Sequence, residues 1–290
     1  MKNRISERII ETLLLLSAVS SVGIVFLLIS YLVFQGYPAI INWVLHGFGM
    51  EFNSIDKFGI IPYIFSTLYV GVGATTLAVA IGLPTAIYLA EFSGPRIRNF
   101  IKPSMETLSG MPSVVMGVIA FFYIAPIVFA FFGGLQCILT AWIILSIMSL
   151  PFVVSISEDA IRAVPQSYRE ASQGLGATKW QTALRVVLPE AKSGILAAIL
   201  LSLASVLGET MAVWMIIGTV NTPPITLNPL LPSNVISSMI ATYIYGSEMG
   251  QSAQLLQSLY GAGLVLLAMI GILNIAVAML IKNRSQVRIK

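Results

Sequence analysis

Residues 170–189 read EASQGLGATKWQTALRVVLP and form a polar, charged segment between two long apolar runs. Pro165, just before this segment, suits the first turn of a helix, where its missing N–H would be unpaired in any case, and Gly176 suits the far end. Thr178 and Gln181 have the spacing of a capping box, which begins a new helix. The segment therefore predicts a helix, a glycine hinge and a second helix, inserted into a chain that is otherwise apolar.

The first of these two helices is expected to be amphipathic. Its apolar positions recur at i, i+4, i+7 and i+11, the spacing of one helical face, and are Val164, Tyr168, Ala171 and Leu175. Charged and polar neighbours such as Arg169 point elsewhere. Such a face can dock on another protein, and the alternative is a solvated loop that contacts nothing.

Apolar residues dominate the composition. Hydrophobic residues make up 57% of the chain and charged residues 10%, and the mean hydropathy is +0.90, so a soluble domain could not bury its apolar side chains. A helix needs about 20 apolar residues to cross about 30 Å of hydrocarbon. Six runs are long enough: residues 12–34, 61–90, 108–132, 135–154, 184–217 and 255–281. The sequence predicts an all-α integral membrane protein with six transmembrane helices.

Positive side chains fall on one side of this topology. Every Lys and Arg except Lys57 lies before the first span, between the second and third, in the loop after the fourth or just beyond it, or after the sixth. The positive-inside rule makes that side cytoplasmic. We therefore expect a multi-pass protein of the plasma or inner membrane with both termini in the cytoplasm, which requires an even number of spans.

The same residues bear on partners. The net charge is +4, but the positive residues are spread along the ends of apolar spans. Attraction to anionic membrane lipid is therefore a simpler use for them than nucleic-acid binding. Cys137 is the only cysteine in the sequence, so an intramolecular disulfide or a cysteine metal cluster is excluded, and its place within span four favours a packing role. No cofactor is expected.

The predicted organisation has three parts. Residues 1–60 form a peripheral transmembrane helix, read as a retained span and not as a cleaved signal peptide, with an outer loop from residue 35 that contains His46. Residues 61–282 form the transmembrane domain, with a cytoplasmic loop at about 158–192, and residues 283–290 form a cytoplasmic tail. A second outer loop, 219–254, is rich in proline, cannot continue a helix, and is expected to form a cap or a re-entrant segment.

Four prolines interrupt the predicted spans, namely Pro84, Pro112, Pro126 and Pro151. Such breaks are tolerated where neighbouring helices or a water-filled path satisfy the freed carbonyls, which suits a transporter. Ordinary helix kinks are the alternative.

Glu209 is the one ionisable residue deep inside a predicted span. A carboxylate at that depth costs about 2.5 to 3.5 kcal/mol on insertion scales, so it marks a candidate translocation pathway. Ser202 and Ser205 precede it by seven and four residues and are expected on the same helical face, and Thr210 adjoins it. A structural glutamate, hydrogen-bonded between helices, is the alternative.

Part of the polar segment resembles the EAA loop of ABC importer permeases. The matching positions are Glu170, Ala171, Ser172, Gly176, Val186, Leu188 and Pro189, where Ser172 stands for the usual alanine. The resemblance implies a type I ABC importer permease fold, in which Glu170, Ala171, Ser172, Gly176, Leu188 and Pro189 form the coupling loop that docks on an ATPase.

Four further motifs resemble the PstC family of phosphate permeases: FGIIP at 58–62, GMPSV at 110–114, SEDAIRAVP at 157–165 and LGETMAV at 207–213. This resemblance implies a phosphate importer in which the chain pairs with a second permease subunit, an ATP-binding subunit dimer and an extracytoplasmic phosphate-binding protein. Many family members carry a basic residue where this chain has Ser205. A cation from the partner permease, a protonated Glu209, or a Glu209 that pairs with a partner arginine would each compensate.

Three alternatives differ in class. The first is an ABC permease for another oxyanion, such as molybdate or sulfate, and the second is an ion-coupled secondary transporter that uses Glu209 as a proton site. An intramembrane hydrolase is a weaker third, because the spans lack a Ser, His and Asp set. The sequence has no GxxxxGK[ST] motif, so ATP hydrolysis is expected in a separate chain and this chain is not expected to be an enzyme.

Overall fold

The computed structural model describes residues 2–46, 59–218, 220, 225–245 and 253–287, and the regular structure in these ranges is helical. Six helical segments are long and apolar enough to cross a membrane: Ile10–Val44, Ile61–Phe92, Ser113–Phe132, Ile138–Arg162, Lys179–Gly208 and Leu255–Met279. The predicted number of spans is thereby confirmed, although several boundaries differ from those predicted.

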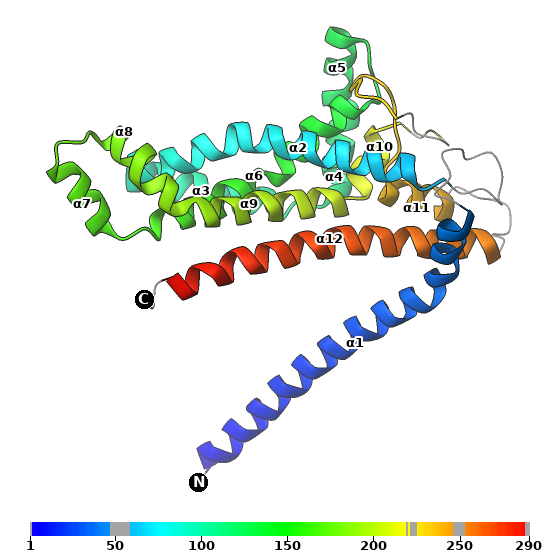
Figure 1. The fold of residues 1–290 in the computed structure, drawn as a ribbon, viewed down its shortest axis with the longest axis horizontal. Helices are drawn as coiled ribbons and strands as arrows, with labels where there is room; N and C mark the ends of the chain where they lie inside the picture. Colours follow the sequence, from blue (N-terminus) through cyan, green and yellow to red (C-terminus); the bar gives the residue numbers. More distant parts are fainter. Residues whose placement is uncertain (1, 47–58, 219, 221–224, 246–252, 288–290) are drawn as a thin grey trace.

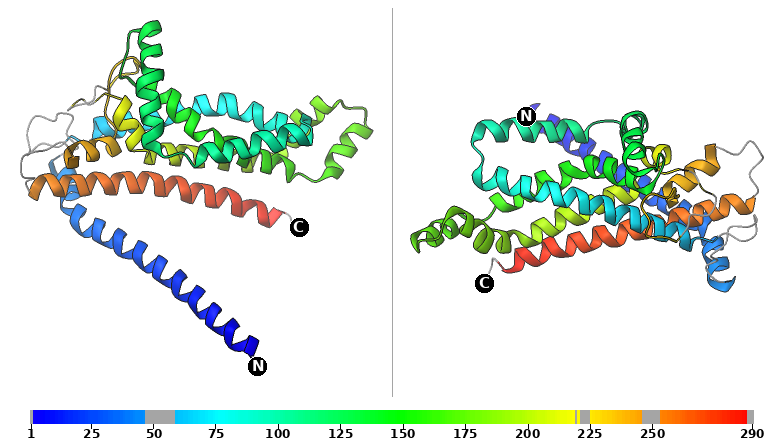
Figure 2. Two further views of the ribbon diagram at one scale, coloured as in Figure 1. Left: turned by 180° about the vertical axis from the view of Figure 1, so that it is seen from behind. Right: turned by 90° about the horizontal axis from the view of Figure 1, so that it is seen from above.

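Four long helices lie side by side along the molecule (Figure 1). They are α2 (Ile61–Ile87), α6 (Ile138–Arg162), α9 (Leu188–Gly208) and α12 (Ala253–Val287). Among them, α6 packs on both α2 and α9, and α12 covers α9. The remaining long helix, α1 (Lys2–His46), contacts α12 near one end and diverges from the bundle toward its N-terminus (Figure 2).

Small residues allow the central helices to approach closely. A Cβ added at Gly71 of α2 would lie 2.6 Å from the Leu207 side chain of α9, and one at Gly82 would lie 2.9 Å from Val153 of α6. Real Cβ contacts are not this short, so a larger residue at either crossing would force the neighbouring side chain to move. The close approach buries a core in which side chains from α2, α6, α9 and α10 (Met211–Ile216) meet.

The first helix is longer than predicted. The expected outer loop began at residue 35, but α1 continues as a helix to His46, with Pro38 inside it. Packing explains the extension, because Ala39 and Trp43 are buried against Leu259 and its neighbours on α12. The rest of the predicted loop, 47–58, lies outside the described residues. At the other end of the chain, α12 extends to Val287 and so includes much of the predicted tail.

The third predicted span, 108–132, begins in the wrong place. A separate helix, α3 (Pro95–Ser109), precedes a break at residues 110–112, and the span itself begins at Ser113. Pro112 takes an extended backbone (φ −59°, ψ 132°) and starts a new helix, α4 (Ser113–Ile119). The chain then passes through a π-helical turn, η2 (Ala120–Ile124), into α5 (Ala125–Phe132), which stands across the direction of the long helices (Figure 1).

The fourth span is displaced toward its C-terminal end. It was predicted at 135–154, but α6 runs from Ile138 to Arg162. Cys137 is therefore the residue that precedes the helix and not a residue within the span, although it is fully buried. The last turns of α6 remain helical because their charged residues are paired, as described below.

The fifth span was predicted as one run over 184–217, and this is wrong. The helix α9 ends at Gly208, Glu209 is extended (φ −70°, ψ 127°), and a short helix, α10, follows. A distant residue stabilises the break, because the Ser237 hydroxyl of α11 (Ile236–Tyr245) donates to the Glu209 carbonyl at 2.8 Å. α11 lies inside the predicted outer loop 219–254, so that loop contains a helix, which packs on α2, α10 and α12.

Three π-helical turns occur close to prolines. They are η1 (Tyr88–Phe92) after Pro84, η2 before Pro126, and η3 (Ala183–Val187) before Pro189. Pro126 and Pro189 each free the carbonyl four residues earlier, which lies within η2 or η3, and a wider turn gives the backbone a way to accommodate it. Pro84 precedes η1, so this reason does not apply to η1. The predicted breaks at Pro126 and Pro112 coincide with element boundaries, whereas Pro84 and Pro151 lie inside continuous helices.

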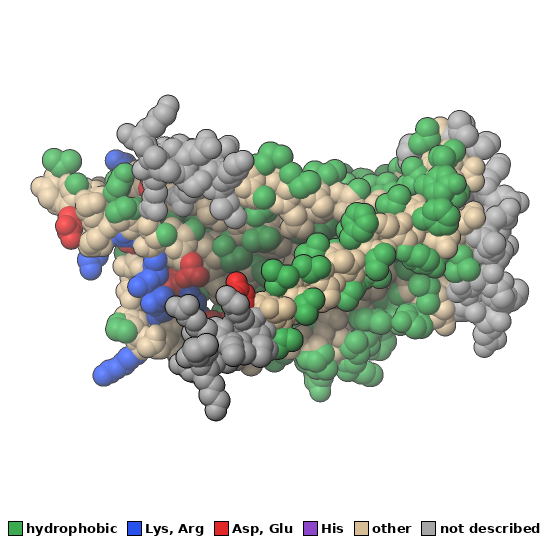
Figure 3. Space-filling view, turned by 90° about the horizontal axis from the view of Figure 1, so that it is seen from below, with side chains coloured by type: hydrophobic (Ala, Val, Ile, Leu, Met, Phe, Trp, Pro, Cys, Tyr) green, Lys and Arg blue, Asp and Glu red, His purple; other side chains and the backbone are tan. Residues whose placement is uncertain are grey.

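Charged side chains gather toward one end of the molecule. On the face shown in Figure 3, Lys, Arg, Asp and Glu cluster toward the end that carries α7 (Gln166–Gly174) and α8 (Lys179–Thr182), and apolar side chains cover much of the remainder. We call this the charged end. α1 begins and α12 ends on this same side (Figure 1).

Candidate functional site

The polar segment folds as a helix, a turn and a helix at the charged end, as predicted. Pro165 precedes α7, and Gly176 ends it with a left-handed backbone (φ 88°). The Gly176 N–H donates to the Gln173 carbonyl at 2.9 Å, and the Ala177 N–H donates to the Ser172 carbonyl at 3.2 Å. These two bonds make a Schellman motif, in which glycine is favoured because a Cβ disfavours positive φ.

The second helix begins with the predicted capping box. The Gln181 N–H donates to the Thr178 hydroxyl at 3.2 Å, and the Thr178 N–H donates to the Gln181 side-chain oxygen at 2.9 Å. α8 then continues through η3 into α9, so the loop is joined to a membrane span without an intervening coil. The loop and α9 therefore form one continuous helical segment.

Arg169 fastens α7 to the rest of the protein. Its guanidinium forms an ion pair, at 2.7 Å, with Glu91 of η1, the turn that continues α2, and both side chains are largely buried. The same guanidinium donates to the carbonyls of Val164 at 2.6 Å and Ile161 at 2.9 Å. One side chain thus connects α7, the end of α6 and the end of α2, and the amphipathic pattern gave no indication of this.

Ser172, the departure from the EAA triplet, also makes a contact. Its hydroxyl lies 3.0 Å from the Thr182 hydroxyl of α8, and Thr182 is almost completely buried. A hydrogen bond therefore joins the two loop helices at this point. Alanine at position 172 could not form it.

An apolar patch is exposed on the loop. Leu175 is 91% exposed, and Tyr168 and Trp180 are about half exposed, with Ala171 also on the surface. We call these four residues the loop patch. Val164, predicted to share their face, is instead buried with Ile161 in a cluster that fastens the loop to α2 and α9. We call α7, the Gly176 turn and α8 the elbow. Several exposed apolar side chains on one such unit are typical of an interaction surface.

The other predicted loop residues have different surroundings. Glu170 is exposed on α7, and Pro189 is exposed in the first turn of α9. Leu188 packs against the buried cluster that contains Val187 and Ala191. The structure therefore brings the motif positions close together. Glu170 and Pro189 lie on the surface, and Leu188 packs inside.

A buried carboxylate organises the ion pairs beside this elbow. Glu158 of α6 is 1% exposed, accepts from the Arg98 guanidinium at 2.6 Å, and lies 3.3 Å from the Lys102 ammonium. Lys102 also donates to Asp159 at 2.7 Å, and the hydrogen bond to Asp159 is the main factor that raises the pKa of Lys102. Both cations come from α3, so these contacts hold α3 against α6.

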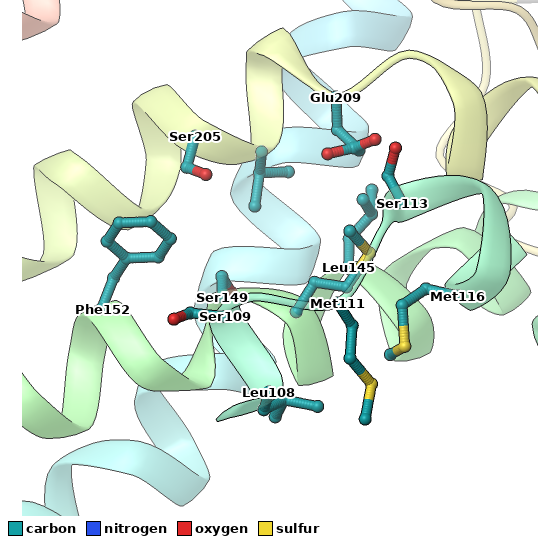
Figure 4. Close-up of a pocket in the computed structure, with 12 residues that line it drawn as sticks. Leu108, Ser109, Met111, Ser113, Met116, Leu145, Ser149, Phe152, Ser205 and Glu209 are labelled. Atoms are coloured by element: carbon teal, nitrogen blue, oxygen red, sulfur yellow. The ribbon is translucent and has the colours of Figure 1, made fainter. Parts of the chain in front are cut away.

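A pocket of about 170 Å³ lies where two broken helices meet. It is bordered by the junction of α3 and α4, by α6 and by the end of α9 (Figure 4). Its lining residues are Leu108, Ser109, Met111, Ser113, Met116, Leu145, Met148, Ser149, Phe152, Ser205, Val206 and Glu209. Interrupted helices at a cavity within a membrane bundle are a recurring way to build a solute site.

The predicted pathway residues separate into two groups. Ser205 and Glu209 line the pocket, and the Glu209 carboxylate has no hydrogen bond or ion pair to the residues that the structure describes. Ser202 is fully buried and its hydroxyl is unpaired there, while Thr210 donates to the Gly208 carbonyl at 3.3 Å outside the lining. The four residues therefore do not form a single stripe, because Ser202 of α9 is buried inside the bundle and the chain leaves the helix at Glu209, before Thr210.

Sequence reasoning missed the other hydroxyls of the pocket. Ser109, Ser113 and Ser149 come from α3, α4 and α6, and so lie far from Ser205 in the sequence. A serine on either side of the Pro112 break was the available signal, because a helix break at membrane depth requires polar surroundings. Within the described chain, no cluster of His, Cys, Asp or Glu could hold a metal ion.

Comparison with known proteins identifies the family. The family described as binding-protein-dependent transport system inner membrane component matches residues 82–286. The chain belongs to this family. It is therefore a multi-pass membrane permease of an ABC importer, and α7, α8 and the broken helices lie within the matched region.

Individual relatives agree with this assignment. The chain is 34% identical to a probable ABC transporter permease protein, YqgH, of Bacillus subtilis over 75% of this chain and 70% of that one. It is 33% identical to the phosphate transport system permease protein PstC of Mesorhizobium japonicum over 64% of this chain and 63% of that one. It is also 33% identical to PstA 1 of Mycobacterium tuberculosis over 77% and 70%.

A solved structure shows the same fold. The inward-facing MetNI methionine ABC transporter aligns over 77% of this chain and 95% of that chain, with a TM-score of 0.60 and 18% identity. The predicted type I ABC importer permease fold is thereby confirmed.

Proposed function

We propose that this chain is a membrane-spanning subunit of an ATP-driven phosphate importer. It translocates inorganic phosphate, delivered by an extracytoplasmic phosphate-binding protein, together with a second permease subunit and an ATP-binding subunit dimer. The charged end and both termini lie in the cytoplasm, because positive residues concentrate there. Lipid surrounds the apolar faces.

The loop patch is the observation that carries the proposal. Leu175, Tyr168 and Trp180 project from an elbow whose own position is fixed by Arg169, by the Ser172–Thr182 contact and by the Gly176 turn. An exposed apolar surface on a rigid base suits a contact that must transmit force. The ATP-binding subunit is the partner that an importer permease must contact from the cytoplasm.

The substrate assignment rests on the relatives. Several of them carry the names PstC and PstA, and PstC and PstA are both named as phosphate transport system permeases. Membership of a binding-protein-dependent family disfavours an ion-coupled carrier that works alone. Importers of molybdate or sulfate remain the main alternative for the substrate.

The mechanism follows from how the elbow is joined to the spans. When the ATP-binding subunits close, they displace α7, and the displacement passes through α8 and η3 into α9 and through Arg169 into α2 and α6. Ser205 and Glu209 lie near the end of α9, so this movement alters the pocket between α9 and the α3–α4 junction. The geometry supports these two residues in the pathway and does not support Ser202 or Thr210.

Transport assays test the substrate. The four-component complex is reconstituted in vesicles, and ATP hydrolysis is measured with the binding protein and phosphate, sulfate or molybdate. Phosphate should stimulate hydrolysis and its own uptake. Stimulation by sulfate or molybdate alone would overturn the phosphate assignment, and uptake without ATP-binding subunits would overturn the importer mechanism.

Crosslinking tests the docking surface. Ala171→Cys introduces a surface thiol into a chain whose native Cys137 is fully buried. A short thiol crosslinker should join this position to the ATP-binding subunit in the assembled complex. Leu227→Cys, 72% exposed but remote from the loop, is the matched control and should not be captured.

A further inference from the structure

The chemistry of the pocket is unusual for an anion site. Its lining offers the hydroxyls of Ser109, Ser113, Ser149 and Ser205 and the carboxylate of Glu209, and among its lining residues there is no Lys, Arg or His. The one ionisable side chain of the lining is therefore an acid, at the place where the proposed function requires an anion to pass.

Two of the hydroxyls are available to donate. Ser109 already donates to the Glu106 carbonyl at 2.8 Å, and Ser149 donates to the Ser146 carbonyl at 3.2 Å. The hydroxyls of Ser113 and Ser205 form no hydrogen bond with other described residues. Figure 4 shows their hydroxyls and the Glu209 carboxylate directed toward the same space.

An ionised carboxylate can only accept hydrogen bonds. It repels an oxyanion that has no proton, such as sulfate or molybdate at neutral pH, because like charges in a site of low dielectric constant are not screened. Inorganic phosphate differs, because it keeps at least one P–OH group at neutral pH. That group can donate a short, charge-assisted hydrogen bond to a carboxylate.

We propose that Glu209 makes the pocket selective for an oxyanion that carries a proton. Glu209 accepts the hydrogen bond of the P–OH group, and Ser113 and Ser205 donate to the unprotonated oxygens. The inference rests on the proposed function and adds a second selection step within the membrane, separate from the binding protein. It also explains how the pocket works with Ser205 in place of a cation.

Protection of a pocket thiol tests this directly, without the binding protein. Met111→Cys places a cysteine in the lining at a position that is 42% exposed, and the native Cys137 is fully buried. The purified permease and ATP-binding subunit complex is treated with N-ethylmaleimide at fixed ionic strength and neutral pH. Sodium phosphate, sodium arsenate, which is also protonated, or sodium sulfate is added over a range of concentrations.

Phosphate and arsenate should slow labelling, and sulfate should require a concentration at least about tenfold higher, because a site built around one substrate hydrogen rejects the analogue that lacks it. Adding Glu209→Gln to Met111→Cys should remove this preference, since an amide can both donate and accept. Glu209→Asp should keep it. Glu106→Gln, an exposed glutamate on α3, is the matched control and should leave the preference unchanged.

The outcomes separate three failures. If phosphate protects and the preference over sulfate survives Glu209→Gln, the role of Glu209 is wrong while the phosphate permease stands. If sulfate protects and phosphate does not, the proposed substrate is wrong as well. Absence of protection by any oxyanion, in a complex that co-purifies intact, would overturn the pocket as a binding site.

Discussion

Two glutamates of the charged end are paired with cations, whereas the glutamate of the pocket is not paired within the described chain. At the charged end, Glu158 is buried with two cations within 3.3 Å, and Glu91 is paired with Arg169. In the pocket, Glu209 has no partner among the described residues, and the hydroxyls of Ser113 and Ser205 are equally unengaged. A region that satisfies its polar groups internally is stiff, and one that leaves them unpaired is prepared for a ligand.

This difference assigns separate tasks to the two regions. Arg169 and the ion pairs of Glu158 hold α2, α3, α6 and α7 together at the charged end, so that end can move as a unit. The pocket is bordered by the breaks at Pro112 and Glu209, where helices can change their relative tilt. Substitutions at the charged end should therefore lower stability strongly, and substitutions in the pocket should change function without loss of stability.

The same substitution at both glutamates gives the sharpest contrast. Glu158→Gln removes the buried counter-charge of Arg98 and Lys102, which are themselves partly exposed, and should cost about 3 kcal/mol. Glu209→Gln removes no contact within the described chain and should change stability by less than about 0.5 kcal/mol. Thermal unfolding of the purified protein in detergent measures both. Similar losses from the two variants would abolish the distinction.

Loss of the Arg169 contacts at α7 should have the next largest effect on stability. Arg169→Ala removes an ion pair and two hydrogen bonds from a largely buried guanidinium and should cost about 2 to 3 kcal/mol, with loss of uptake. Arg185→Ala, an exposed arginine on η3, is the control and should change stability little. The ion pair itself is tested further by Glu91→Ala. The double variant with Arg169→Ala should lose less stability than the sum of the two single variants, because both remove the same ion pair.

The local features of the loop could be predicted from the sequence, because neighbouring residues determine them. The capping box at Thr178 and Gln181 and the turn at Gly176 depend on backbone groups a few residues away. The lengths of the apolar runs also predicted six spans. A helix crosses a membrane because it is long and apolar enough, whatever its tertiary contacts are.

The contacts that define the candidate site could not be predicted in the same way. Arg169 and Glu91 are 78 residues apart in the sequence, and the break at Glu209 is stabilised by a hydroxyl from Ser237. Apolar residues lie on both sides of residues 209 and 210, so the sequence predicts a single helix there. Only the packed structure shows which distant donor replaces the helical hydrogen bond.

The glycine turn tests whether the elbow itself must be rigid. Gly176→Ala forces a Cβ into a left-handed backbone and should cost about 1 to 2 kcal/mol, although the surrounding space is open. Gly174→Ala, two residues earlier in ordinary helix and equally open, should instead stabilise α7 by about 0.5 to 1 kcal/mol. Thermal unfolding and the ATPase response of the complex report both variants. Equal behaviour would show that the left-handed turn is not required.

The contact between Ser172 and Thr182 should give the smallest effect. Ser172→Ala leaves the buried Thr182 hydroxyl without this partner and should cost about 1 kcal/mol, with uptake retained, since alanine is usual at this position of the EAA loop. Thr182→Val and the double variant complete a cycle, and the coupling between the two sites should be about 0.5 to 1 kcal/mol. A coupling of zero would mean that the two loop helices are held together by Arg169 and the Gly176 turn alone, and the stiffness of the charged end would then rest on its ion pairs and its backbone.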